Sequence, residues 1–182
     1  MKSCTLCERA GHFNEGLIGK NYSETGVMFV LHISDSRALR EGYVKAYKKT
    51  NTAQTVDKML KNANLTLDDI VLTNFYKCII PGDTNSSKNK DKIPWKKEYK
   101  NCVGVLDAQI QEIAPKKIVL FGSPVYNNLF GDSREKFEEA VGRVKFFRNI
   151  GAFISYHPSG LRFKWNAEKK RVQDNLTEYL LN

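Results

Sequence analysis

One histidine closes an apolar, β-prone run near the end of the chain. His157 follows residues 152–156, and Pro158, Ser159 and Gly160 come directly after it. Proline and glycine end a strand and force a turn, so the imidazole is expected at the carboxyl end of a buried strand. In α/β sheets that edge is where ligands bind. A surface turn that happens to contain a histidine is the alternative interpretation of this stretch taken alone.

Polar residues also end two earlier apolar runs. His32 and Asp35 lie at the end of the run 27–33, and Asn74 follows residues 70–73. Because the carboxyl ends of parallel strands share one edge, we expect these side chains to converge with His157 on one cleft. Each also has a simpler explanation. Asp and Asn are common in turns and caps, and His32 is equally an ordinary histidine at a strand end.

Four cysteines form the second chemical pattern. Cys4 and Cys7 make a C-x2-C pair, whereas Cys78 and Cys102 stand far apart in the sequence. Four thiolates suit a tetrahedral zinc ion or an iron–sulfur cluster, and the spacing does not choose between them. Such a site would tie the N-terminal segment to the core. Four unrelated buried cysteines are the alternative.

Strand-length apolar runs alternate with helical patterns along the chain. This alternation predicts a three-layer α/β/α fold with a central four-stranded parallel sheet, and residues 1–182 as a single domain. The expected strands are residues 27–33, 70–73, 117–121 and 152–156, with a minor strand at 144–148, and the expected helices are residues 52–64, 98–113, 133–141 and 166–181.

The chain is basic, with a formal net charge of +9 and a pI of about 9.3. A basic surface favours a polyanionic partner, nucleic acid first. Basic runs at residues 37–49 and 88–97 flank two of the strand-end clusters, although solvated loops would look the same. No apolar run has the roughly 20 residues of a membrane helix, and no signal peptide is evident. We therefore expect a cytoplasmic protein that has reduced thiols and does not bind a membrane.

The order of these pieces resembles one family, the iron–sulfur uracil-DNA glycosylases of the family 4 type, within the uracil-DNA glycosylase superfamily. The resemblance runs from residue 4 to about residue 162. It is carried by Cys4-Thr5-Leu6-Cys7, by Thr73-Asn74-Phe75-Tyr76-Lys77-Cys78, by Cys102, by the strand and turn Ile118-Val119-Leu120-Phe121-Gly122-Ser123, and by Tyr156-His157-Pro158-Ser159.

The resemblance implies a cofactor and a partner. It implies a [4Fe-4S] cluster rather than zinc, held by the four cysteines, and a four-stranded parallel sheet between helices. Its partner would be DNA, single- or double-stranded, and we expect a monomer. The ligands would be Cys4, Cys7, Cys78 and Cys102.

Cleavage of an N-glycosidic bond assigns roles to the strand-end residues. The base must be flipped into a pocket, and its O2 gains negative charge as it leaves. His157 can donate to that oxygen, and the Asn74 amide can accept from uracil N3–H and donate to O4. In the loop after His157, Ser159 would hold a phosphate, Leu161 would wedge into the stack, and Arg162 would meet the DNA backbone. A turn residue at Asn74 and a core leucine at Leu161 are the alternatives.

Two departures from the family pattern concern the first motif. The family glutamate that positions the attacking water falls on His32, which can act as a base if neutral. Asp35 is the other candidate for orienting the water. The phenylalanine that stacks on the flipped base has no clean counterpart, and Tyr43 or Tyr47 is nearest.

These observations lead to three hypotheses. The first is a monofunctional glycosylase that excises uracil, or a related deaminated base, in DNA repair. The second is a weak or inactive glycosylase-fold protein that keeps the cluster and binds DNA. The third, a zinc-bound RNA-binding protein, requires the cysteine match to be misleading.

Overall fold

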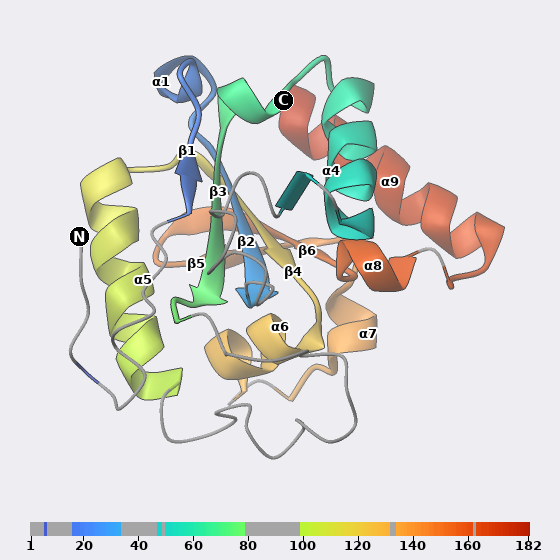
Figure 1. Cartoon of the computed structure of the whole chain (residues 1–182). Helices are drawn as coiled ribbons and strands as arrows, with labels where there is room; N and C mark the ends of the chain where they lie inside the picture. The colour runs from blue at the N-terminus through green and yellow to red at the C-terminus, as the bar shows by residue number, and fades with distance from the viewer. Residues whose placement is uncertain are drawn as a thin grey trace.

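Six strands form one mixed sheet in the part of the chain that the structure describes (Figure 1). The structure is a computed structural model, and it describes residue 6 and residues 16–33, 47–48, 50–78, 99–131, 134–161 and 163–182. The strand order is β1-β3-β2-β4-β6-β5. The strands are β1 (Leu17–Ile18), β2 (Val27–Ile33), β3 (Ile70–Tyr76), β4 (Lys117–Phe121), β5 (Val144–Phe147) and β6 (Ile150–Ser155).

The four central strands, β3-β2-β4-β6, are all parallel, as the sequence predicts. The sheet is wider than predicted because an antiparallel strand is added at each edge. At one edge β1 pairs with β3, with Leu17 opposite Leu72. At the other edge β5 pairs with β6, with Phe146 opposite Gly151. A mainly parallel sheet with antiparallel edge strands is a common form of α/β fold.

Helices cover both faces of this sheet (Figure 1). In the described residues α4 and α9 pack against each other on one side, while α5 contacts β3 and α6 contacts β2 and β4. Right-handed crossovers account for the two layers, because β2 to β3 and β3 to β4 move in opposite directions across the sheet. The helical elements are α1 (Tyr22–Thr25), α4 (Asn51–Asn62), η2 (Leu67–Asp69), α5 (Tyr99–Ile113), α6 (Ser123–Phe130), α7 (Phe137–Ala140), α8 (Pro158–Leu161) and α9 (Asn166–Leu181).

The closing helix α9 locks the amino ends of two strands. Val172, Leu176 and Leu180 recur every four residues and are buried on one face of the helix. The Tyr179 hydroxyl accepts from the Ile118 backbone N–H at 3.0 Å. The same hydroxyl donates to the Gly151 carbonyl at 2.5 Å, which connects β4 and β6. The predicted polar site residues are at the opposite side of the sheet, toward the carboxyl ends of the parallel strands.

The predicted end of the second strand is wrong. The run at residues 70–73 was expected to stop at Asn74, but β3 continues to Tyr76. The reason is the parallel register with β2, in which Leu31 lies opposite Asn74 and Ile33 opposite Tyr76. Asn74 is therefore a strand residue rather than a turn residue.

None of the helices in the described ranges has the length and apolar character needed to cross a bilayer.

Candidate active site

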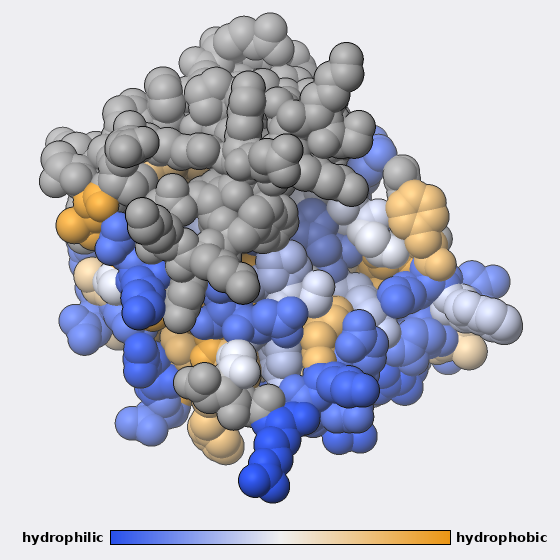
Figure 2. Space-filling view, turned by 90° about the horizontal axis from the view of Figure 1, so that it is seen from below, coloured by the Kyte–Doolittle hydropathy of each residue, from blue (hydrophilic) through white to orange (hydrophobic). Residues whose placement is uncertain are grey.

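Three residues with polar side chains lie toward the carboxyl ends of parallel strands, on the side where the β2 and β3 arrows end in Figure 1. His32 is the next-to-last residue of β2, Asn74 lies in β3, and His157 follows β6. Figure 2 views this side, and its described surface is mostly hydrophilic around the grey atoms. The charge of His157 contributes to the pKa of His32, so the two imidazoles lie within electrostatic range. The structure thus brings the two histidines together from separate strands.

The turn after β6 fixes the proton position on His157. The Ser159 backbone N–H donates to His157 Nδ1 at 3.3 Å, and Ser159 Oγ lies 2.8 Å from the same nitrogen. A backbone N–H can only donate, so this bond favours the tautomer with the lone pair on Nδ1 and the proton on Nε2, in which the Ser159 hydroxyl also donates to Nδ1. The His157 carbonyl accepts from the Gly160 and Leu161 N–H groups, which closes the single turn of α8. His157 therefore presents an Nε2–H donor.

Burial keeps both histidines neutral. It lowers the pKa of His157 to about 4. Burial also lowers the pKa of His32 to about 4, with a smaller contribution from repulsion by His157. Desolvation disfavours the charged imidazolium, which accounts for both directions. At neutral pH the site accordingly contains two uncharged imidazoles.

A glycine allows β4 to approach His157 closely. Gly122 has φ +90 and ψ 155, a conformation that is essentially restricted to glycine. A Cβ at this position would lie 3.2 Å from the Cβ of His157. The Gly122 N–H also donates to the Ser155 carbonyl at 2.8 Å, which joins β4 to the end of β6. Gly122 is thus a positioning residue for the histidine.

Tyr156 anchors the turn from the other side. Its hydroxyl donates to Glu168 Oε1 of α9 at 3.1 Å, and Lys164 Nζ lies 4.2 Å from its ring centroid. The Phe137 ring meets it edge-on, with centroids 5.7 Å apart. Glu168 is in turn paired with Arg171 at 2.9 Å. Contacts from α7 and α9 therefore hold the residue that precedes His157.

His32 and Asn74 lie on adjacent strands. The rings of His32 and Tyr76 meet edge-on at 5.3 Å, in the register that pairs β2 with β3. Asn74 is 1% exposed, although it is a polar residue. Buried amides are hydrogen-bonded in folded proteins, so we expect an ordered side chain here.

The remaining predicted site residues are placed differently. Tyr47 is buried, 6% exposed, in the core. Leu161 is 0% exposed in α8 and packs in the core, so in this conformation it does not project from the surface. Ser159 lies beside His157 as described. Asp35, Tyr43 and Arg162 lie outside the described residues.

Two of the four cysteines are described. Cys78 and Cys102 are both buried thiols, at the exit of β3 and in the first turn of α5. Cys4 and Cys7 lie outside the described residues, but Leu6 between them is described. Its carbonyl accepts from Asn101 Nδ2 at 2.8 Å, beside Cys102. Within the described ranges no three His, Cys, Asp or Glu residues form a metal-binding group, a search that does not include the C-x2-C pair.

Sequence reasoning missed the buried lysine of the second motif. Lys77 is 1% exposed, and its ammonium donates to Thr73 Oγ1 at 2.7 Å and to Gln109 Oε1. Burial lowers its pKa to about 7. No pattern in the sequence distinguishes this lysine from an exposed one, because its partner Gln109 comes from α5.

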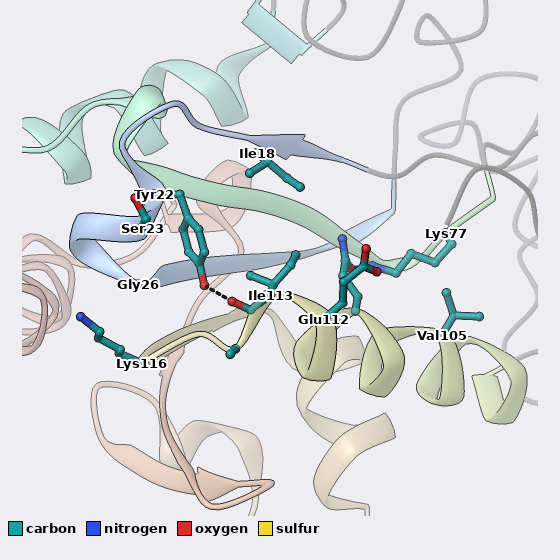
Figure 3. A pocket seen from close by; sticks show the side chains of 11 residues that line it. Ile18, Tyr22, Ser23, Gly26, Lys77, Val105, Glu112, Ile113 and Lys116 are labelled. Carbon is teal, nitrogen blue, oxygen red and sulfur yellow. Dashed lines mark hydrogen bonds between the residues drawn. The ribbon is translucent and has the colours of Figure 1, made fainter.

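A pocket of about 640 Å³ lies away from the histidines (Figure 3). It runs between α5 and the edge formed by β1 and β3, with Lys77 and Val105 at one end and Tyr22 and Lys116 at the other. The Tyr22 hydroxyl donates to the Ile113 carbonyl across it at 3.4 Å. Neither His157 nor Asn74 lines this pocket, so its size does not identify it as the active site.

The fold is that of a class of DNA glycosylases. Residues 18–181 match the family model of the uracil DNA glycosylase superfamily, and the chain belongs to that superfamily. The match spans β1 to α9 and therefore includes His32, Asn74 and His157. The fold prediction is confirmed by this match.

A more specific similarity is to a type-4 uracil-DNA glycosylase from Sulfurisphaera tokodaii. The two sequences are 28% identical over 181 residues, which covers 94% of this chain and 77% of the relative. This similarity supports the predicted resemblance to the family 4 type. As a member of this superfamily the chain is a DNA glycosylase, and its partner is DNA.

Proposed function

We propose that this chain flips uracil, or a related deaminated base, out of DNA and hydrolyses its N-glycosidic bond in base-excision repair. The observation that carries the proposal is the buried, neutral His157, whose Nδ1 accepts from the Ser159 amide, an arrangement that favours the proton on Nε2. A fixed donor at the carboxyl edge of the sheet can meet the charge that develops on O2 of the leaving base. Donors of this kind contribute about 10²- to 10³-fold to the rate.

Neutrality suits His157 for this role. An uncharged imidazole donates a hydrogen bond without attracting a phosphate group into the base pocket. Because its pKa is about 4, the imidazole is too weak a base to take up a proton at neutral pH. The donor stays preorganised through the reaction because Gly122 and Tyr156 hold its backbone from two sides.

His32 is proposed to orient the attacking water. With a pKa of about 4 it is about as basic as an ordinary carboxylate, which is the group expected in this place. It lacks the negative charge, however, and so gives no Coulomb stabilisation to the oxocarbenium-like sugar. We therefore expect excision that is slower than with a carboxylate, by an amount that His32→Glu would reveal.

Asn74 is proposed to read the base. Its amide can accept from N3–H and donate to O4 of uracil, while cytosine presents the opposite pattern. A mismatch would leave a buried group unpaired at a cost of about 1–3 kcal/mol. The burial of Asn74 supports this role, because an ordered amide discriminates better than a mobile one.

The cysteines are proposed to hold a [4Fe-4S] cluster, with Cys4, Cys7, Cys78 and Cys102 as ligands. The donor set fits, since the thiols of Cys78, after β3, and Cys102, in α5, are each buried and Leu6 is hydrogen-bonded to Asn101 beside Cys102. When bound, the cluster supplies a covalent cross-link between the N-terminal segment and the core. Zinc would be held by the same four thiolates.

Purified protein incubated with a uracil-containing oligonucleotide and then alkali tests the activity. We expect strand breaks at uracil that fall at least about 100-fold in His157→Ala. Asn62→Ala, an exposed change on α4, is the control and should cleave like the parent. Absence of breaks on both single- and double-stranded DNA would refute the proposal.

A second function is favoured by one observation, the histidine in place of the water-binding carboxylate. In that case the chain would bind DNA through the same edge without cutting it. Binding without strand breaks in the parent, with no gain in His32→Glu, would support this alternative.

The cluster is tested by colour and metal content. The protein purified without oxygen should be brown with about four iron atoms per chain, and Cys102→Ser should lose both. A colourless protein with one zinc per chain would refute the iron–sulfur proposal.

A further inference from the structure

Two large aromatic side chains are exposed immediately after the His157 turn. Phe163 is 74% exposed and Trp165 is 86% exposed. Scattered exposed apolar residues are ordinary, but here two aromatic rings lie two residues apart with Lys164 between them. Sequence patterns gave no reason to select them, because their exposure becomes apparent only in the fold.

These aromatic residues are part of the same short structure as the active-site turn. The Phe163 N–H donates to the Gly160 carbonyl and the Lys164 N–H to the Leu161 carbonyl, both at 3.1 Å. Lys164 then folds back so that its ammonium lies over the Tyr156 ring. Trp165 caps the start of α9, where its carbonyl accepts from Lys169 at 2.9 Å. These bonds fix the backbone that carries the two rings close to the His157 turn.

The charges around this surface favour a polyanion. Lys164 lies between the two aromatic residues in the sequence, and Lys169 and Lys170 follow in α9, in a chain with a net charge of +9. The nearby carboxylate, Glu168, is already engaged by Arg171 and by the Tyr156 hydroxyl. Exposed aromatic rings interleaved with lysines are the usual means of binding single-stranded nucleic acid, because each base offers a face for stacking.

We propose that Phe163 and Trp165 form a stacking surface for unpaired bases of the DNA strand that enters the active site. The inference rests on the proposed function for the identity of that strand, and it adds a preference for single-stranded or locally opened DNA. Stacking is sequence-tolerant, so the surface would hold any base beside the flipped one.

Binding to a labelled oligothymidylate that contains no uracil tests the surface without any excision. Trp165→Ala is expected to weaken single-strand binding about 5- to 100-fold, the range for one stacked base. Trp165→Phe should restore most of it and Trp165→Leu should not, because leucine keeps the apolar area but lacks a flat π-face. Phe146→Ala is the matched control.

Phe146 suits this purpose because it is 78% exposed but lies opposite Gly151, near the amino end of β6. His157 follows the carboxyl end of that strand, so the control residue lies on the opposite side of the sheet, where the parallel strands begin. Phe146→Ala should bind like the parent.

Fluorescence provides a direct reading of contact. In a Trp95→Phe background Trp165 is the remaining tryptophan, and its emission should be quenched by the oligothymidylate. Thermal unfolding of each variant shows that the fold is kept. Equal binding by Trp165→Ala, Trp165→Leu and the parent, together with no quenching of Trp165 emission in the Trp95→Phe protein, would overturn the proposal.

The outcomes separate this inference from the proposed function. Uracil excision with unchanged binding in Trp165→Ala would refute the stacking surface and keep the glycosylase. Loss of binding in Trp165→Ala, without excision by the parent, would keep the stacking surface in a DNA-binding protein that does not cut.

Discussion

The amide of Ser159 favours the His157 tautomer that carries its proton on Nε2. Because the backbone N–H bonds to Nδ1, the ring must remain neutral for the turn of α8 to keep this contact. Protonation of Nδ1 would replace an attraction by a clash of two donors. The low pKa of His157 and the geometry of the turn thus favour the same state.

The pH dependence of excision follows from this neutral state. Single-turnover rates should be nearly constant from about pH 8 to 6 and should fall as the pH approaches 4, where both histidines protonate. An acidic limb centred near the ordinary histidine value of about 6.5 would contradict the burial argument. Circular dichroism at each pH distinguishes loss of the proton state from unfolding.

Stability should depend on pH in the same direction. The folded-state pKa values, about 4, lie below the unfolded value of about 6.5, so the unfolded chain binds more protons between these limits. The contribution of these two histidines to the free energy of unfolding is therefore fully present above about pH 6.5 and is lost as the pH falls toward 4. Urea unfolding at pH 7 and pH 5 measures it, and His157→Gln should flatten the slope.

Gly122 and Gly104 offer a matched pair of glycine substitutions. Gly122→Ala introduces a Cβ at 3.2 Å from His157 in a glycine-only conformation, which costs about 1–3 kcal/mol and displaces the histidine. Gly104 lies in α5 with nothing within 4 Å of an added Cβ, so Gly104→Ala should stabilise by about 0.5–1 kcal/mol. The denaturant midpoint should fall in Gly122→Ala and rise in Gly104→Ala. The excision rate should be lost only in Gly122→Ala.

At the scale of elements, α9 stabilises the sheet through one apolar face. Leu176 is 1% exposed on that face, so Leu176→Ala should lower the free energy of unfolding by about 2–5 kcal/mol. Glu178 is exposed on the same helix, and Glu178→Ala should change stability by less than about 0.5 kcal/mol. Thermal unfolding distinguishes these outcomes, and a Leu176→Ala melting point equal to the parent would contradict the packing.

Elements with strong local patterns could be predicted from the sequence. The bounds expected for β2, β4 and α9 agree with those observed, because fully apolar runs and a four-residue apolar repeat are unambiguous. The two-residue strand β1 could not be predicted, since Leu17 and Ile18 acquire strand geometry only by pairing with β3. The extension of β3 through Asn74 likewise depends on its neighbour β2.

The site could be predicted in part for the same reason. His32, Asn74 and His157 follow from where apolar runs end, and the parallel sheet brings their strands to one edge. The tautomer of His157, the glycine contact at Gly122 and the buried state of Leu161 depend on three-dimensional packing, which no local pattern encodes.

At the scale of the whole molecule, a net charge of +9 dominates the approach to DNA. Each phosphate neutralised adds about −0.9 to the log–log slope of duplex affinity against salt, and about −0.7 for a single strand. We expect a duplex slope of about −3 or steeper, from three or more phosphate contacts. Anisotropy titrations at several salt concentrations measure it, and a slope near zero would indicate binding that does not involve the basic surface.

The hydrogen bond between Leu6 and Asn101 spans 95 residues of sequence. During synthesis, at roughly 5–20 residues per second, the N-terminal C-x2-C pair is made about 5–20 seconds before Cys102. A centre that needs thiols from both segments cannot be assembled in that interval. Its assembly is therefore a late event in the life of each chain, and until then the early pair depends on a reducing environment to remain unoxidised.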